Sequence, residues 1–537
     1  MRHSWRTALG LASVLCLVGA RLAPGAAAQS PRRPNVLLII ADDQNNDLGT
    51  YGAPVSTPNI DRLAQRGVRF DHAYDQYPLC SPSRSSFLTG LRPDSVGIYD
   101  LTTHFRTRHP KIVTLPQLFK NDGYFTARVG KIYHYNVPMA IGTNGLDDAV
   151  SWNAVYNPRG NDRENMETIV GVGPHGSSSY RVDDVPDELE TDGMVASQAV
   201  DLLRQNRNRP FFLAVGFFRP HFPYVAPKKY FDLYPVEQIP APADPTADVA
   251  DVPAAALMST RPLNQGMNNA EMRLAIRGYR AGTSFMDSQV GRVLAELDRL
   301  GLRESTIVVF LGDHGYSLGQ KGLWMKQNVY EQGARAPLII SAPGRRSGVA
   351  TPAIVEFVDI YPTIADLAGL TAPAYLQGRS LKPLLADPQT SWPYAAFTQI
   401  QRAGGGPSFV EPEDARAARA MHAPAVPDTG GAPRFSHPWA ARAMAEKEGL
   451  PDPRYAKKRE GTPPRETFMG RSVRTDRWRY TEWDGGRRGV ELYDELNDPG
   501  ETKNLASDPR YASTAAELKK LLATDGRPMD LTESMRH

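Results

Sequence analysis

The stretch Asn35-Val36-Leu37-Leu38-Ile39-Ile40-Ala41-Asp42-Asp43 indicates the fold of this 537-residue chain. Its apolar run does not alternate with polar residues, which is typical of a strand buried on both faces in a parallel sheet. Similar apolar runs recur at 213–217, 306–311 and 338–340, and residues 270–300 carry apolar side chains at helical spacing. Because strands alternate with helices, the sequence predicts an α/β fold with a mostly parallel sheet sandwiched by helices.

Acidic residues follow two of these runs. Asp42 and Asp43 end the first run, and Asp313 follows the run at 306–311. Ligands of parallel α/β sheets bind beyond the carboxyl ends of the strands, so we expect the three carboxylates to meet there. Adjacent carboxylates repel each other unless a cation lies between them, and hard oxygen ligands suit calcium or magnesium. The pattern predicts a metal site, with a simple turn or helix cap as the alternative.

The N-terminus has the pattern of a secretory signal peptide, predicted over residues 1–28. Arg2 and Arg6 precede an apolar stretch from Leu9 to Ala20, and small residues up to Ala28 offer a cleavage site. This stretch is too short for a stable membrane span. Its removal would take the formal net charge from +3 to zero, because it carries three arginines and no acidic residue. We therefore expect a secreted or periplasmic protein with no stable membrane span and no nucleic-acid partner.

The composition changes near residue 400. Residues 401–466 are rich in Ala, Gly, Pro, Arg and Glu, and we interpret them as a loop or linker insertion. Residues 470–480 then alternate like an edge or half-exposed strand, and a turn at 484–486 leads into another strand. A closing helix is predicted over about 512–523. These patterns divide the chain into an α/β domain (29–400), the insertion, and a smaller C-terminal subdomain with an antiparallel sheet (467–537).

Cys80 is one of two cysteines and, after removal of the signal peptide with Cys16, the only one. A lone thiol in an exported protein has no internal disulfide partner, so it is either buried and inert or retained for chemistry. Pro82 follows two residues later and Arg84 four residues later, which gives the spacing C-x-P-x-R. The structural alternative is a buried cysteine at the start of a helix with proline in its first turn.

Together these motifs resemble the formylglycine-dependent sulfatases. In that family a formylglycine-generating enzyme oxidises the cysteine of C-x-P-x-R to formylglycine (3-oxoalanine), so the resemblance implies this maturation partner. The segments 80–94, 313–319 and 324–326 are similar to the iduronate sulfatase branch. The likeness covers about Asn35 to Gly344 and the C-terminal hairpin, and it fails across 403–466. It implies an alkaline-phosphatase-like fold with residues 29–400 as the catalytic domain.

The resemblance also implies a set of metal ligands. One divalent cation, usually calcium in this family, would be bound by Asp42, Asp43, Cys80 (as formylglycine), Asp313 and His314. An imidazole is a softer ligand than calcium prefers, so His314 leaves open manganese, zinc or an indirect role.

The catalytic residues implied by the resemblance come from three further segments and from the C-x-P-x-R motif itself. Gly130–His134 implies that Lys131 contacts sulfate and that His134 drives sulfate release by moving a proton. Arg219–Pro223 places His221 near the ester oxygen, and Trp324–Lys326 makes Lys326 a clamp on sulfate. Arg84 would support the formylglycine. Each of these positions also has a plain alternative, because surface lysines and loop histidines are common.

This residue set suits hydrolysis of a sulfate ester. The ester is an anion, so a cation with lysine and arginine side chains must neutralise its oxygens as charge moves in the transition state. We expect a sulfated carbohydrate as substrate, with the sugar left open because the unmatched segment 403–466 is of the kind that shapes pockets. Two alternatives remain at this point: a phosphodiester or phosphonate hydrolase of the same superfamily, and a non-catalytic binder of sulfated glycans if Cys80 is not oxidised.

Overall fold

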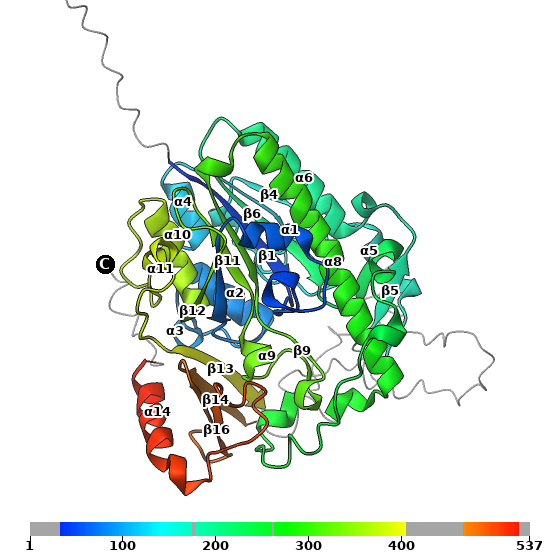
Figure 1. Ribbon diagram of the computed structural model, residues 1–537. Coiled ribbons are helices and arrows are strands. Elements are labelled where there is room, and N and C mark those ends of the chain that lie inside the picture. The colour runs from blue at the N-terminus through cyan, green and yellow to red at the C-terminus, as the bar shows by residue number, and fades with distance from the viewer. Residues whose placement is uncertain (1–32, 174–177, 260–262, 404–465, 526–537) are drawn as a thin grey trace, which may run out of the picture. The chain divides into compact units, whose positions relative to one another are not determined.

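An eight-stranded sheet lies at the centre of the structure, a computed structural model that describes residues 33–173, 178–259, 263–403 and 466–525 (Figure 1). The strand order is β12-β2-β11-β8-β1-β6-β3-β4. These strands are β1 (Asn35–Asp42), β2 (Val68–Tyr74), β3 (Phe125–Gly130), β4 (Ala154–Tyr156), β6 (Phe211–Pro220), β8 (Thr306–Gly312), β11 (Leu338–Ser341) and β12 (Val349–Glu356). The predicted signal peptide lies outside the described residues, and so do residues 404–465 of the insertion predicted over 401–466.

The predicted mostly parallel sheet is confirmed, with one exception. β11 runs antiparallel to both of its neighbours, β8 and β2. All other neighbouring pairs in the central sheet are parallel. The apolar run at 338–340 was grouped with the parallel strands because burial on both faces leaves the same composition in either direction.

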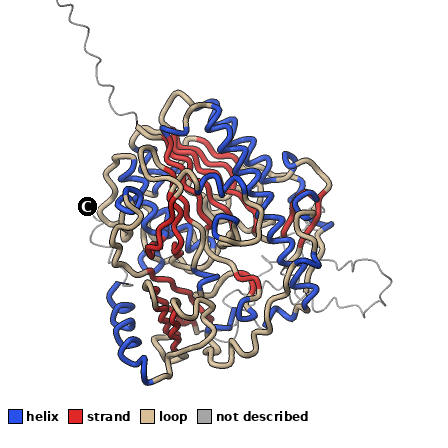
Figure 2. Tube along the Cα trace, in the orientation of Figure 1, coloured by secondary structure: helices blue, strands red, loops and turns tan. Residues whose placement is uncertain are grey.

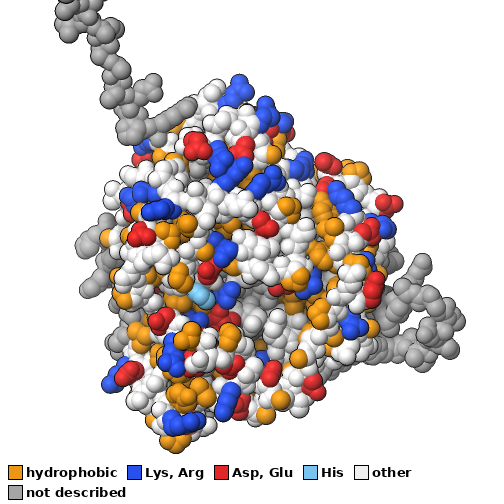
Figure 3. All heavy atoms as spheres, viewed as in Figure 1, with side chains coloured by type: hydrophobic (Ala, Val, Ile, Leu, Met, Phe, Trp, Pro, Cys, Tyr) orange, Lys and Arg blue, Asp and Glu red, His pale blue; other side chains and the backbone are white. Residues whose placement is uncertain are grey.

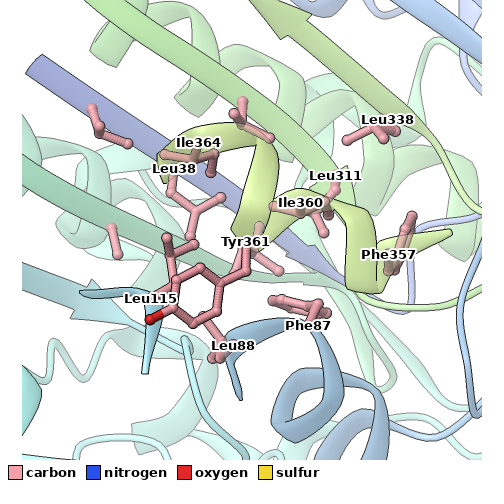
Figure 4. Packing of buried hydrophobic residues seen from close by; sticks show 14 of the residues in the cluster. Leu38, Phe87, Leu88, Leu115, Leu311, Leu338, Phe357, Ile360, Tyr361 and Ile364 are labelled. Carbon is pink, nitrogen blue, oxygen red and sulfur yellow. The ribbon is translucent and has the colours of Figure 1, made fainter. Parts of the chain in front are cut away.

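The burial of β1 explains its unbroken apolar run. Val36, Leu38 and Ile40 belong to one core cluster, whereas Leu37 and Ile39 belong to a second cluster on the opposite face. The first face is covered by α2 (Cys80–Thr89), α4 (Leu115–Asn121), α10 (Ile360–Leu367) and α11 (Lys382–Ala386). Figure 4 shows this core from close by, with Leu38 between the side chains of α2, α4 and α10. The second face is covered by α1 (Pro58–Ala64), α6 (Thr191–Asn206) and α8 (Asn269–Arg299).

The long helix α8 matches the predicted helix at 270–300. It begins with a capping box, in which the Asn268 side chain accepts from the backbone of Glu271 and the Glu271 carboxylate accepts from the backbone of Asn268. Phe285, Val290 and Leu297 are buried against the rest of the fold. Figure 1 shows α8 running beside α6 across the sheet.

Smaller elements complete the main domain. The helices are α3 (Pro93–Val96), α5 (Asn161–Glu164), α7 (Lys228–Phe231) and α9 (Glu331–Ala334). Two pairs of short strands are β5 (Tyr180–Asp183) with β7 (Tyr224–Pro227), and β9 (Ser317–Leu318) with β10 (Trp324–Met325). No helix in the described ranges has the length and apolar character needed to cross a membrane.

A separate antiparallel sheet lies near the C-terminus, as predicted (Figure 2). It consists of β13 (Ala396–Ala403), β14 (Thr467–Arg474), β15 (Trp478–Trp483) and β16 (Val490–Asp494), and α14 (Ala512–Asp525) packs on it. Its first strand, β13, spans the domain boundary that we placed at residue 400.

The prediction of one strand over 470–480 was wrong. The chain turns at Thr475–Arg477, where the backbone N–H of Thr475 donates to the carbonyl of Trp478 at 2.8 Å. β14 and β15 then pair as a hairpin. The turn was missed because its Thr-Asp-Arg sequence contains no glycine or proline, the residues that usually mark a reversal.

Candidate active site

Four neighbouring strands of the central sheet bring the predicted residues to one edge. In the order β8-β1-β6-β3, β8 is followed by Asp313, β1 ends at Asp42, β6 is followed by His221 and β3 is followed by Lys131. These are the carboxyl ends of parallel strands, where ligands of such sheets bind. The segment after β2 reaches the same place and begins α2 at Cys80.

The Cys80 thiol lies at the centre of this cluster and is 1% exposed. The Lys326 ammonium donates to its sulfur at 3.1 Å, and His314 Nε2 lies 3.3 Å from it. Asp43 Oδ1 lies 3.8 Å from the same sulfur. Burial and the nearby Asp42 carboxylate raise the pKa of the thiol well above its usual value. A neutral, enclosed thiol is a poor nucleophile, so the cysteine as encoded is not suited to catalysis.

Arg84, four residues along α2, links the two acidic turns. Its guanidinium donates to Asp313 Oδ2 at 2.9 Å and to Asp42 Oδ1 at 3.2 Å. It also donates to the carbonyls of Lys131 at 2.6 Å and Ile132 at 3.0 Å. Burial alone would lower the pKa of Arg84, but Asp313 and Asp42 raise it. The C-x-P-x-R spacing therefore places residue 80 and the arginine on the same side of one helix, both against the carboxylates.

Two lysines balance the charge of the β1 acids. Lys131 Nζ donates to Asp42 at 2.5 Å, and Lys326 Nζ donates to Asp43 at 2.5 Å. Burial would raise the pKa of Asp42, but Lys131, His221 and Arg84 hold it well below its usual value. The pKa of Asp43 is instead raised, because burial and the Asp42 charge outweigh Lys326.

The three predicted histidines differ in their contacts. His314 Nδ1 lies 2.8 Å from the Gly315 carbonyl and His221 Nδ1 lies 2.5 Å from the Phe222 carbonyl, so each Nδ1–H donates to the backbone and each Nε2 faces the cluster. His221 Nε2 lies 3.7 Å from Asp43 Oδ2. His134 Nδ1 is buried and has no hydrogen-bond partner among the described residues. Burial lowers the pKa of both His134 and His221 well below the usual value. The charge of Lys131 adds to this effect at His134, and the charge of Lys326 adds to it at His221.

The donor atoms suit a bound metal ion. Ligand atoms of Asp42, Asp43, Cys80 and His221 lie within 4.8 Å of one another, and so do those of Cys80, Asp313 and His314. Asp43 Oδ2 is buried and accepts no hydrogen bond from the described residues. A buried carboxylate oxygen with no donor is costly unless a cation binds it. The structure thus brings all five predicted ligands together, and it adds His221, which we had placed only near the ester oxygen.

Glycine permits the close approach of β3 to β6 beside this cluster. The Lys131 N–H donates to the Gly216 carbonyl at 3.0 Å. A Cβ at Gly216 would lie 2.0 Å from the Lys131 carbonyl oxygen, and one at Gly130 would lie 2.1 Å from the Gly216 carbonyl oxygen. Lys131 therefore keeps its position only because both residues lack a side chain.

The loop that carries Lys326 is held by the C-terminal sheet. Arg402 of β13 donates to the Gln327 carbonyl at 2.6 Å, and Arg479 of β15 donates to the Val329 carbonyl at 2.9 Å. On the other side, the Gln327 N–H donates to the Pro78 carbonyl at 3.0 Å, close to Cys80. The small C-terminal sheet therefore helps to position a residue of the site, a role that its sequence did not reveal.

Comparison with known proteins agrees with this geometry. The sulfatase family model matches residues 34–370. A protein named sulfatase from Formosa agariphila is 30% identical over 513 residues, with 91% of this chain and 86% of that protein covered. Iduronate 2-sulfatase from Homo sapiens is 36% identical over 388 residues, with 63% of this chain and 70% of that protein covered. The solved structure of the phosphonate monoester hydrolase from Silicibacter pomeroyi has a TM-score of 0.69 at 22% identity, covers 93% of this chain and 97% of its own, and bears on the fold alone.

The sheet order and the separate antiparallel sheet give the chain the alkaline-phosphatase-like fold. The sulfatase family model matches more than half of the chain. Both relatives are named as sulfatases, and the alignments cover most of their length. The chain belongs to the formylglycine-dependent sulfatase family and is a sulfuric ester hydrolase.

Proposed function

We propose that this protein is an exported sulfatase that removes 2-O-sulfate from sulfated uronic acids, and that its nucleophile is formylglycine made from Cys80. The observation that carries the proposal is the position of Cys80, which is buried among two lysines, two histidines and three carboxylates. Oxidised and hydrated, residue 80 would supply two hydroxyls, one to attack sulfur and one to lose its proton as sulfate leaves.

The cation in this proposal is calcium, held by Asp42, Asp43, Asp313 and His314 together with residue 80. Three carboxylates provide the hard oxygen ligands that calcium prefers. A bound divalent cation would neutralise sulfate oxygens and lower the pKa of the attacking hydroxyl.

Each remaining side chain has a role consistent with its surroundings. Asp43 has its pKa raised by burial, so it is suited to accept the proton of the attacking hydroxyl. Lys326 has its pKa raised by Asp43 despite burial, so it stays charged and donates to the departing alcohol oxygen. His221 lies beside it at Asp43 and helps to orient that oxygen. His134 is neutral and has a free Nδ1, so it accepts the proton whose loss expels sulfate.

The substrate class rests on the relatives and on the charge of the site. The human and mouse proteins that are 36% identical to this chain are named iduronate 2-sulfatase. Lys131, Lys326 and Arg84 supply the positive charge that a sulfate group requires. Basic and acidic side chains are interspersed over the face seen in Figure 3.

Turnover of defined esters tests the proposal. Protein co-expressed with a formylglycine-generating enzyme is assayed on a 2-O-sulfated uronate disaccharide, an aryl sulfate and an aryl phosphodiester, with Cys80→Ala as the control. We expect sulfate release from the uronate by the wild type and none by C80A. Faster turnover of the phosphodiester would favour a phosphoryl hydrolase, and binding of the disaccharide without turnover would favour a glycan-binding protein.

Export is a second part of the proposal. The charge and apolar pattern of residues 1–28 supports it. N-terminal sequencing of the protein recovered outside the cytoplasm should begin at Gln29, whereas a mature protein that keeps Arg2 and Arg6 would contradict it.

A further inference from the structure

Three buried tyrosines lie beneath the two turns that carry the acidic ligands. Tyr279 of α8, Tyr224 of β7 and Tyr316 are each fully buried. The Tyr279 ring stacks on the Tyr316 ring with centroids 5.2 Å apart, and the hydroxyls of Tyr224 and Tyr316 lie 2.9 Å apart. None of the three was singled out by sequence, because Tyr279 falls on the apolar face of a helix and reads as an ordinary core residue.

The Tyr279 hydroxyl holds the backbone around Asp43. It donates to the Asp43 carbonyl at 2.8 Å and accepts from the Asn45 N–H at 2.9 Å. One hydroxyl thus fixes the peptide groups on both sides of Gln44. The Asn45 side chain in turn donates to the Tyr316 carbonyl at 2.9 Å, which ties this turn to the one that follows Asp313 and His314.

Asp43 needs this support because its backbone is in a rare conformation. Its φ is 63°, in the left-handed region that favours glycine. Such a conformation costs free energy in a residue with a side chain and persists only where the surroundings enforce it. The left-handed turn directs the Asp43 carboxylate to the cluster, where Oδ1 lies 2.5 Å from Lys326 Nζ and 3.3 Å from His314 Nε2.

We propose that Tyr279 is a positioning residue for the metal site: its hydroxyl fixes Asp43 in the left-handed turn and thereby sets the affinity for the divalent cation. This inference rests on the proposed metal site. Tyr279 does not reach the cluster itself, and its two hydrogen bonds go to backbone atoms of the turn. Partners of this kind behind metal ligands change metal affinity by about 10- to 100-fold when they are removed.

Tyr279→Phe isolates the effect, because it removes one oxygen atom and leaves the stacked ring in place. Tyr224→Phe is the matched control: Tyr224 is equally buried and also loses a hydroxyl contact, the one to Tyr316, without touching the Asp43 turn. Both variants and the wild type are prepared with residue 80 modified, stripped of metal, and titrated with Ca²⁺ by calorimetry. Circular dichroism and the Tm of the metal-free proteins establish that each variant is folded.

We expect the Kd for Ca²⁺ to rise about 10- to 100-fold in Y279F and less than about threefold in Y224F. A merely structural role would lower the metal-free Tm of both variants and leave the Kd unchanged. Equal Kd values in Y279F and the wild type, or equal losses in both variants, would overturn the inference. A wild type that binds no divalent cation would refute the metal site itself, so the two failures are distinguishable.

Discussion

Replacing Arg479 by methionine should destabilise the junction between the two sheets. Arg479 is 1% exposed and pairs with three buried glutamates. Its Nε lies 3.1 Å from the Glu495 carboxylate and 2.7 Å from the Glu501 carboxylate, and its Nη2 donates to Glu331 of α9. The pKa of Glu495 is already raised to about 9 by burial and by the charges of Glu501 and Glu331, so this side chain is protonated at neutral pH.

The expected loss in the free energy of unfolding depends on Glu331, the carboxylate that stays charged in the wild type. Burial would raise the pKa of Glu331, but Arg479, Arg474 and Arg335 hold it below its ordinary value of 4.5. Without Arg479, Glu331 keeps its ion pairs with Arg474 at 3.1 Å and Arg335 at 3.3 Å, and the largest expected loss is the cost of taking up a proton on folding. At pH 7.5, which is about three pH units above the ordinary pKa of 4.5, that protonation costs about 4 kcal/mol. This value matches the usual cost of breaking a buried ion pair.

The stability difference between the wild type and R479M depends on pH through Glu331. In the wild type a lowered pKa of Glu331 stabilises the fold at neutral pH, and this contribution is lost as the pH falls through the folded-state pKa. In R479M the cost of protonating Glu331 shrinks by about 1.4 kcal/mol per pH unit as the pH falls toward 4.5. The difference in stability between the two proteins should therefore shrink by about 3 kcal/mol from pH 7.5 to pH 5.5.

Urea unfolding at both pH values measures these differences. Arg477→Met is the matched control. Arg477 lies two residues before Arg479, and its exposed side chain pairs with Asp494 of β16, so we expect a loss below about 1 kcal/mol. A loss in R479M no larger than in R477M, or one that does not change with pH, would refute the reasoning.

Three further predictions concern the site. Arg84→Lys should lower kcat/KM by at least about 100-fold in a sulfate-release assay, because lysine cannot donate at once to Asp42, Asp313 and two carbonyls; near wild-type kcat/KM would count against this. Gly216→Ala should lower the Tm by more than about 5 °C in a thermal melt, since its Cβ would lie 2.0 Å from the Lys131 carbonyl oxygen; an unchanged Tm would show that the strands can separate. Chelation with EDTA should lower the Tm and added Ca²⁺ should restore it, because the clustered carboxylates lose their cation; a Tm insensitive to both would contradict a bound metal.

Much of the fold could be predicted because strands buried on both faces contain almost no polar residues. The run from Val36 to Ile40 lacks polar residues, since its side chains enter two different core clusters on the two faces of the sheet. The direction of a strand does not change its composition, so the antiparallel β11 could not be distinguished from its parallel neighbours. The hairpin at Thr475–Arg477 was hidden for a similar reason, because its turn residues are ordinary polar ones.

The site was predictable where its residues directly follow strands. Asp42 and Asp313 stand at the ends of apolar runs, and C-x-P-x-R is a local pattern. The supporting residues lack such signals: Tyr279 has helical spacing like any core residue, and Arg402 acts on a loop 75 residues away in sequence. Gly216 shows its role only when the Lys131 backbone is seen beside it. Such contacts depend on tertiary packing and are absent from any single stretch of sequence.

The central claim is that Cys80 is converted to formylglycine and serves as the nucleophile. Peptide mass spectrometry across Cys80, on active protein from its native host, tests it most directly. We predict a peptide lighter by about 18 Da than the unmodified sequence, the change from thiol to aldehyde. A fully unmodified thiol in protein that still hydrolyses a sulfate ester would contradict the account.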